Sequence, residues 1–268
     1  MKIAFIGGGN MASAIMAGLC KQGQSAADIL VLEPYAPQRE KLLQDFAGLQ
    51  VLEQVDARLA AAELVVWAIK PQIFKEVAQT VKAHTSQALH LSVAAGIHSD
   101  SIARWLGSER VVRAMPNTPA LVGQGISGLF ARAQVTQPER QLIEQTLQAT
   151  GQFLWVAQEA DLDAVTALSG SGPAYVFYFM EHMMAAGVAM GLSALQAEKL
   201  TLATFSGAAH LAASSAEPAA VLRERVTSKG GTTYAALTAM QSAQVGENIE
   251  AALHRAQVRA QELGAEFG

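Results

Sequence analysis

The sequence predicts an α/β domain built on a doubly wound parallel sheet, followed by an all-α second half. Short apolar runs alternate with segments of helical periodicity through the first part of the chain, which is the order that a parallel sheet requires. The first of these runs ends in a glycine-rich turn. Beyond Asp161 no segment has the pattern of a strand. We therefore expect two domains, at residues 1–158 and 159–268.

The composition of the 268-residue chain fits large apolar cores and excludes several classes of partner. Hydrophobic residues make up 51% and charged residues 16%, which argues against disorder. The formal net charge of −4 provides no basic surface for nucleic acid or an anionic membrane. The single cysteine, Cys20, cannot form an internal disulfide, which fits a reducing compartment. The most apolar stretch, 174–191, carries Glu181 and His182 at its centre, and no basic leader precedes the first strand, so we expect a cytoplasmic protein without a membrane span.

The first strand, expected at residues 2–6, runs directly into a turn of the form G-x-G-x-x-A. This is the dinucleotide fingerprint, and a helix that ends near Gly23 follows it. Gly7 permits a tight turn, Gly9 lets the backbone approach a pyrophosphate, and Ala12 lets the helix pack closely on the strand. The helix N-terminus then offers unpaired N–H groups to the phosphates. An ordinary βα turn is the alternative; we predict a Rossmann domain whose cofactor-binding residues include Gly7, Gly8, Gly9, Asn10, Met11 and Ala12.

The second strand, expected at residues 28–32, ends at Glu33, where the fold places the acid that binds the adenine ribose. A carboxylate suits the ribose hydroxyls of NADH and repels the 2′-phosphate of NADPH. Arg39, in the helix expected over 39–46, offers a guanidinium to that phosphate. Both cofactors therefore stay open.

The later strands of the first domain end in punctuated loops. Strands are expected over 64–69, 89–94, 111–115, 125–131 and 152–156, and helices over 72–83, 99–106 and 138–149. In such sheets ligands bind outside the carboxyl ends of the strands. The alternative interpretation of Lys70 is a charged loop residue that only contacts solvent. We predict further cofactor contacts from Lys70, Pro71, Ala95, Met115 and Asn117.

The second half reads as helices over 161–168, 174–190, 194–214, 217–225, 233–243 and 246–264. Helix 174–190 is apolar nearly all round, so it needs burial on all sides, and a second subunit is the natural cover.

Two stretches of this half, 168–175 and 226–234, are unusually rich in turn residues. In the second, Gly230 and Gly231 precede a helix, and successive N–H groups there form a cradle for an anion such as a carboxylate. Ser228, Thr232 and Thr233 add hydroxyl groups. Ordinary N-capping by Thr232 or Thr233 is the alternative.

Six motifs, taken in order, carry a resemblance to a known family. They are Gly7-Gly8-Gly9-Asn10-Met11, Ile69-Lys70-Pro71, Ala94-Ala95-Gly96, the segment from Arg113 to Pro119, the segment from Ser169 to Tyr175, and Ser228-Lys229-Gly230-Gly231-Thr232-Thr233. Over essentially the full chain the sequence resembles pyrroline-5-carboxylate reductase. The resemblance implies a Rossmann domain, a helical dimerisation domain, NADP(H) or NAD(H) as cofactor, and reduction of 1-pyrroline-5-carboxylate to L-proline, the last step of proline biosynthesis. It also implies a homodimer, which in many members assembles into a larger ring of dimers.

The resemblance also assigns the substrate residues. Thr233 is the catalytic residue, whose hydroxyl meets the ring nitrogen, and the N–H groups of Gly230, Gly231 and Thr232 hold the carboxylate. Glu159 corresponds to a family acid near the substrate, and Ser171 and Ser228 complete the substrate-binding set. Two residues depart from the family pattern: Lys229 stands in place of the usual proline, and Glu33 in place of a small polar residue.

Two other functions are alternatives to this one. A β-hydroxyacid dehydrogenase carries a catalytic lysine on the long helix after a glycine-rich turn, but no lysine lies between Lys82 and Lys199. A cofactor-binding sensor without turnover has no need of the intact loop 228–233. The six histidines are scattered, and no metal-ligand pattern or Ser-His-Asp order appears. We therefore predict no metal.

Overall fold

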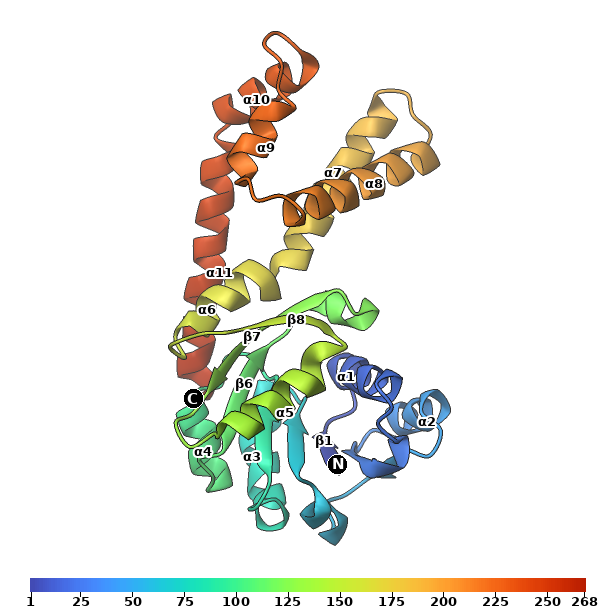
Figure 1. The fold of residues 1–268 in the computed structure, drawn as a ribbon, viewed down its shortest axis with the longest axis vertical. Helices are drawn as coiled ribbons and strands as arrows, with labels where there is room; N and C mark the ends of the chain where they lie inside the picture. The colour runs from blue at the N-terminus through green and yellow to red at the C-terminus, as the bar shows by residue number, and fades with distance from the viewer. The chain divides into compact units, whose positions relative to one another are not determined.

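The computed structural model describes all 268 residues and divides into two compact units (Figure 1). Unit 1 comprises Met1–Pro173 together with Arg255–Gly268, and unit 2 comprises Ala174–His254. The expected boundary between residues 158 and 159 lies where the sheet gives way to helices. As a domain boundary it stays a prediction.

Unit 1 is built on one sheet of eight strands in the order β3-β2-β1-β4-β5-β6-β7-β8. From β3 to β6 neighbouring strands are parallel, but β7 is antiparallel to β6 and parallel to β8. The doubly wound parallel sheet is thus confirmed for six strands, and the last two run the other way. The strands are β1 Ile3–Ile6, β2 Ile29–Leu32, β3 Gln50–Leu52, β4 Leu64–Trp67, β5 Leu89–Ser92, β6 Val111–Met115, β7 Gly125–Ala131 and β8 Gly151–Trp155.

The reversal at β7 follows from the length of its connection. Only a short 3-10 segment, Thr118–Val122, lies between β6 and β7. A parallel connection needs a crossover of a dozen residues or more, whereas an antiparallel neighbour can follow a short loop.

The helices agree with the expected ranges to within a few residues. One difference is that the helix expected over 161–168 is a short α-helix followed by a π-helical turn at Thr166–Gly170. The helices are α1 Asn10–Lys21, α2 Ala36–Asp45, α3 Pro71–Val81, α4 Ser99–Leu106, α5 Gln137–Gln148, α6 Asp161–Val165, α7 Gly172–Ala189, α8 Ala194–Ala213, α9 Ala219–Arg225, α10 Thr232–Ser242 and α11 Val245–Phe267.

Two apolar cores lie on opposite faces of the sheet. α1, α2 and α5 pack on one face with Phe5 and Val66, and α3 and α4 pack on the other with Ala4 and Trp67. Successive residues of a strand point to opposite faces, so a strand covered on both sides is apolar throughout. This is why β1, β2 and β4 are continuous apolar runs.

Buried His90, on β5, is a polar member of the second face. Its Nδ1 accepts a hydrogen bond from Trp67 Nε1 at 3.1 Å, and burial lowers the pKa of His90 from 6.5 to about 4. Between these values the unfolded chain binds more protons than the folded chain, so the free energy of unfolding falls as the pH drops from 6.5 to 4. We expect a loss of about 3 kcal/mol across this window. Urea unfolding at both ends of the window measures it; an unchanged pH dependence in His90→Leu would contradict the assignment.

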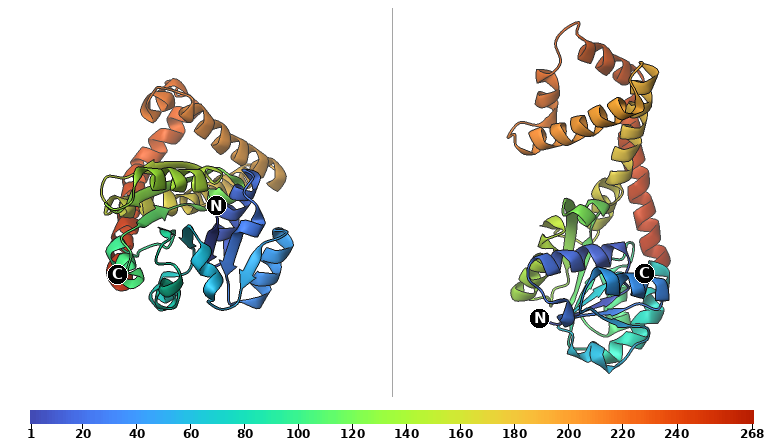
Figure 2. Two further views of the ribbon diagram at one scale, coloured as in Figure 1. Left: turned by 60° about the horizontal axis from the view of Figure 1, so that its bottom comes forward. Right: turned by 90° about the vertical axis from the view of Figure 1, so that its right-hand side faces the viewer.

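The last helix completes unit 1. Gly96, after β5, has φ +74°, and a Cβ there would lie 2.9 Å from the Cβ of Leu263 on α11. Gly264 faces the ring of His98, and Phe267 packs against the second core. Figures 1 and 2 show the C-terminus beside α4. Residues 255–268 therefore belong to unit 1, together with the sheet.

Unit 2 consists of helices alone. In the single chain α7 leaves large apolar side chains uncovered, with Phe177 62% and Tyr178 60% exposed. None of the helices in the chain combines the length and the apolar character that crossing a membrane requires.

Candidate functional site

The β1–α1 turn has the geometry that its glycines predict. Gly7 has φ +92°, and a Cβ there would lie 2.6 Å from the carbonyl oxygen of Ala68. A Cβ on Gly8 would lie 2.5 Å from Leu42. Nothing lies within 4 Å of a Cβ built on Gly9, and Ala12 is fully buried. The turn is therefore tight on its inner side and open at Gly9, where the fingerprint needs room for a pyrophosphate.

The N-terminus of α1 is free to receive an anion. The helix begins at Asn10 after Gly9, no side chain caps it, and its first turn holds no acidic residue. The first N–H groups of a helix have no partner within the helix, and the helix dipole favours negative charge there. Asn10 is exposed and Met11 half-buried. These residues fit the pyrophosphate of a dinucleotide.

Glu33 lies beside this turn, as expected. Its Oε2 accepts the N–H of Gly8 and its Oε1 accepts the N–H of Tyr35, each at 2.9 Å. Arg39 donates to the carbonyl oxygens of Glu33 and Pro34. Both side chains proposed to read the adenine ribose are thus held by protein groups.

The other predicted cofactor residues gather at one edge of the sheet. β1, β4, β5 and β6 are adjacent and parallel, so their carboxyl ends lie together. Lys70 is exposed just before α3 and has no ion-pair partner, and Pro71 is the first residue of that helix. Ala95 follows β5 and Met115 ends β6. Their contacts with a cofactor stay predictions.

Asn117 and Met115 join this edge to the first turn-rich motif. The Asn117 Nδ2 donates to the carbonyl oxygen of Ser169 at 3.2 Å, and its Oδ1 accepts the N–H of Ile126 at 3.0 Å. A Cβ on Gly170 would lie 2.5 Å from the Cε of Met115. Ser171 closes the π-helical turn by donating its N–H to Thr166 at 2.8 Å. The motif is therefore packed on the end of β6, and π-helical turns often occur at functional sites.

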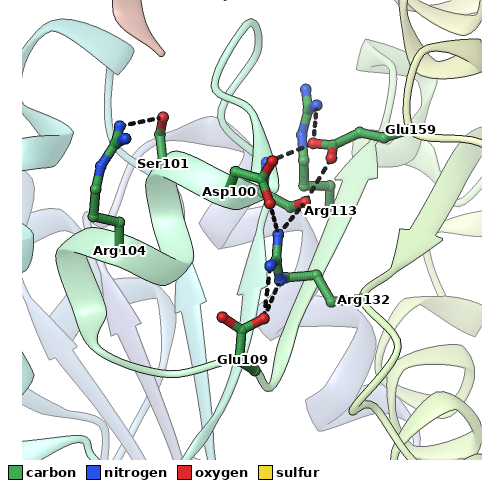
Figure 3. A network of polar contacts seen from close by, with 8 residues as sticks. Asp100, Ser101, Arg104, Glu109, Arg113, Arg132 and Glu159 are labelled. Carbon is green, nitrogen blue, oxygen red and sulfur yellow. Dashed lines mark hydrogen bonds and ion pairs between the residues drawn. The ribbon is translucent and has the colours of Figure 1, made fainter.

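Glu159 lies in a network of charged groups within unit 1 (Figure 3). One of its oxygens accepts from Arg113 Nη1 at 2.7 Å and from the N–H of Ser99, and the other accepts from the Ser99 hydroxyl. Burial by itself raises the pKa of Glu159, but the hydrogen bonds from Ser99 and Arg113 outweigh it and leave the pKa below its usual value. Glu159 thus stays charged and covers the N-terminus of α4, which begins at Ser99. Its contact with substrate stays a prediction.

The partners of Glu159 in this network could not be predicted from the sequence. Arg132 donates to the Ser99 hydroxyl at 3.2 Å and forms ion pairs with Asp100 and Glu109. Arg113 is 7% exposed in the otherwise apolar strand β6. A buried charge needs a partner, so an arginine inside an apolar strand was the one available clue.

The second turn-rich motif lies in unit 2, before α10. Gly230 has φ +75°, and Gly231 donates its N–H to the carbonyl oxygen of Ser228 at 3.0 Å. α10 begins at Thr232 without a side-chain cap and without an acid in its first turn. The alternative of N-capping by Thr232 or Thr233 is therefore wrong.

This motif keeps its donors available. The hydroxyls of Ser228, Thr232 and Thr233 form no hydrogen bond within the protein. The N–H of Gly231 is engaged in the turn, which leaves those of Gly230 and Thr232 for an anion. An uncapped helix start with free hydroxyls and no acid suits a carboxylate.

Several known proteins are similar to this chain in sequence and structure. A family model described as "Pyrroline-5-carboxylate reductase dimerisation" matches residues 159–263, and one described as "NADP oxidoreductase coenzyme F420-dependent" matches residues 2–96. Pyrroline-5-carboxylate reductase of Pseudomonas aeruginosa is 47% identical over 269 residues, covering 100% of this chain and 98% of that protein. The solved pyrroline-5-carboxylate reductase of Coxiella burnetii has a TM-score of 0.89 at 38% identity, and the solved pyrroline carboxylate reductase of Plasmodium falciparum with NADP bound has a TM-score of 0.88 at 27% identity. Each match covers 98% of both chains. The chain belongs to the pyrroline-5-carboxylate reductase family.

Proposed function

We propose that this chain reduces 1-pyrroline-5-carboxylate to L-proline with a hydride from NADH or NADPH, as the last step of proline biosynthesis. The observation that best supports this proposal is the loop 228–233, where an uncapped helix N-terminus and free hydroxyl groups form an anion site. Its chemistry matches a small substrate that bears one carboxylate.

The loop supplies the substrate contacts in this proposal. The N–H groups of Gly230 and Thr232 bind the carboxylate, with the Ser228 hydroxyl as a further donor. The Thr233 hydroxyl orients the ring nitrogen. Ser171, Gly231 and Glu159 complete the predicted set.

The sheet unit supplies the cofactor contacts. The backbone from Gly7 to Ala12 binds the pyrophosphate, and Glu33 accepts from the adenine ribose. Toward the nicotinamide end the candidates are Lys70, Pro71, Ala95, Met115 and Asn117. When bound, the nicotinamide supplies a hydride to the imine carbon.

Orientation accounts for most of the catalysis expected here. A cyclic imine nitrogen is protonated readily in water, so the site needs no strong general acid. Holding the reacting atoms in line supplies the rate enhancement. A hydroxyl at Thr233 positions the nitrogen without carrying charge.

The chain forms a dimer through its helical part, which the dimerisation model matches and where α7 leaves apolar side chains uncovered. Assembly of dimers into a larger ring is a proposal that light scattering tests. A cytoplasmic location is also proposed, supported by the single cysteine in the chain.

The activity is tested by following oxidation of NADH and of NADPH with and without added cyclic imine. We expect oxidation only when the imine is present, with L-proline as the product. Reduction of a 3-oxo acid in its place would favour a β-hydroxyacid dehydrogenase. Cofactor binding without any turnover would favour a sensor.

A further inference from the structure

The carboxylate of Glu33 has a fixed position. Gly8 and Tyr35 donate their N–H groups to its two oxygens, each at 2.9 Å. Turning the carboxylate away from the glycine turn would give up both charge-assisted hydrogen bonds. A negative charge therefore stays beside the place where the fingerprint puts the adenine ribose.

The guanidinium of Arg39 is also committed. Nη1 donates to the carbonyl oxygens of Glu33 at 3.1 Å and Pro34 at 2.6 Å. Nη2 lies 3.3 Å from Oε2 of Glu53, which follows β3. Leu32 and Leu52 are paired in register, so Glu33 and Glu53 leave the sheet side by side. The arginine is thus held between two backbone carbonyl groups after β2 and the carboxylate of Glu53 after β3.

We propose that Glu53 is a specificity-determining residue which, by holding Arg39, makes this chain prefer NADH to NADPH. The proposal deepens the proposed function at its cofactor site and requires only that the chain binds a nicotinamide dinucleotide. Glu33, Arg39 and Glu53 together carry one net negative charge. This favours a ribose diol, which donates hydrogen bonds, over a 2′-phosphate, which adds further negative charge.

Glu33 and Glu53 are expected to differ in the size of their effect on cofactor preference. Glu33 carries its charge at the ribose, so Glu33→Ser should shift the affinity ratio toward NADPH by about tenfold or more. Glu53 is 64% exposed and acts through Arg39, so Glu53→Gln should shift the ratio by about two- to fivefold. In the Glu53→Gln background, Arg39→Ala should abolish the gain, because the arginine released from Glu53 is the group that would bind the phosphate.

Calorimetric titration of the full-length protein with NADH and with NADPH, at one ionic strength and without imine, tests the proposal. Glu40→Gln is the matched control, because Glu40 is an exposed acid on α2, the helix that carries Arg39, and has no ion-pair partner. We expect the wild type to bind NADH more tightly and Glu53→Gln to narrow the difference, with Glu40→Gln unchanged. An NADPH preference in the wild type, or equal effects of the two glutamine variants, would overturn it.

The titration separates this proposal from the proposed function. Selective NADH binding with no imine reduction would contradict the function and leave the role of Glu53 intact. Imine reduction with an NADPH preference would do the reverse. Binding of neither cofactor would contradict both.

Discussion

Replacing Thr233 with alanine is expected to lower kcat by about 10- to 1000-fold, because in the proposed mechanism its hydroxyl positions the reacting nitrogen. The fold should tolerate the change. Thr233 lies in the first turn of α10, and its hydroxyl forms no hydrogen bond within the protein. Steady-state kinetics with the cyclic imine and a thermal unfolding midpoint, measured on the same preparation, test both statements.

Thr238→Ala is the matched control for this change. Thr238 is on the same helix, and its exposed hydroxyl donates to the carbonyl oxygen of Tyr234 at 2.8 Å. We expect it to leave kcat unchanged, and Thr233→Ser to recover most of the rate. A folded Thr233→Ala protein with the kinetics of the wild type would show that this hydroxyl does not act on the substrate.

Replacing Arg113 with alanine is expected to lower the free energy of unfolding by about 3 to 5 kcal/mol. The change leaves Glu159 charged and mostly buried without its cation (Figure 3). Protonating that carboxyl is costly, because the Ser99 hydrogen bonds also favour its charged form. Urea unfolding of the two proteins at neutral pH measures the loss.

Two further variants interpret the Arg113 result. Arg58→Ala removes an exposed pair with Asp56 and should leave the free energy of unfolding nearly unchanged. Combining Arg113→Met with Glu159→Gln should recover much of the loss, because removing both charges leaves no unpaired one. If Arg113→Ala costs no more than Arg58→Ala, the network does not stabilise unit 1 in this way.

The order of elements could be predicted from the sequence because the patterns that define them are local. A glycine turn between a strand and a helix is readable within a dozen residues, and so is an apolar run. β3, with three residues and one buried position, is too short to show a period. The direction of β7 depends on connection length, which periodicity does not record.

The candidate site was less predictable, because its contacts join distant segments. Glu33 could be located by its spacing from the glycine turn, but not its bond to Gly8, which lies 25 residues earlier. Arg113 and Glu159 are 46 residues apart and meet through the order of the strands. Glu53 could not be distinguished from any other exposed acid.

The helical half shows the reverse case. Its sequence predicts a contact with a second subunit, which the structure of a single chain does not contain. The apolar residues all round α7 predicted cover by a second subunit. Within one chain those side chains are exposed. The match of residues 159–263 to a dimerisation family agrees with a dimer that covers them.

The position of α11 has a consequence for synthesis. Leu263, Gly264 and Phe267 are synthesised after all of unit 2, yet they pack against Gly96, His98 and the second core. Nascent chains fold from the N-terminus as each unit becomes complete. The sheet emerges early but lacks the packing of α11 until unit 2 has been synthesised, so its partly folded form is exposed to chaperones and proteases for the whole time that the helical unit is being made.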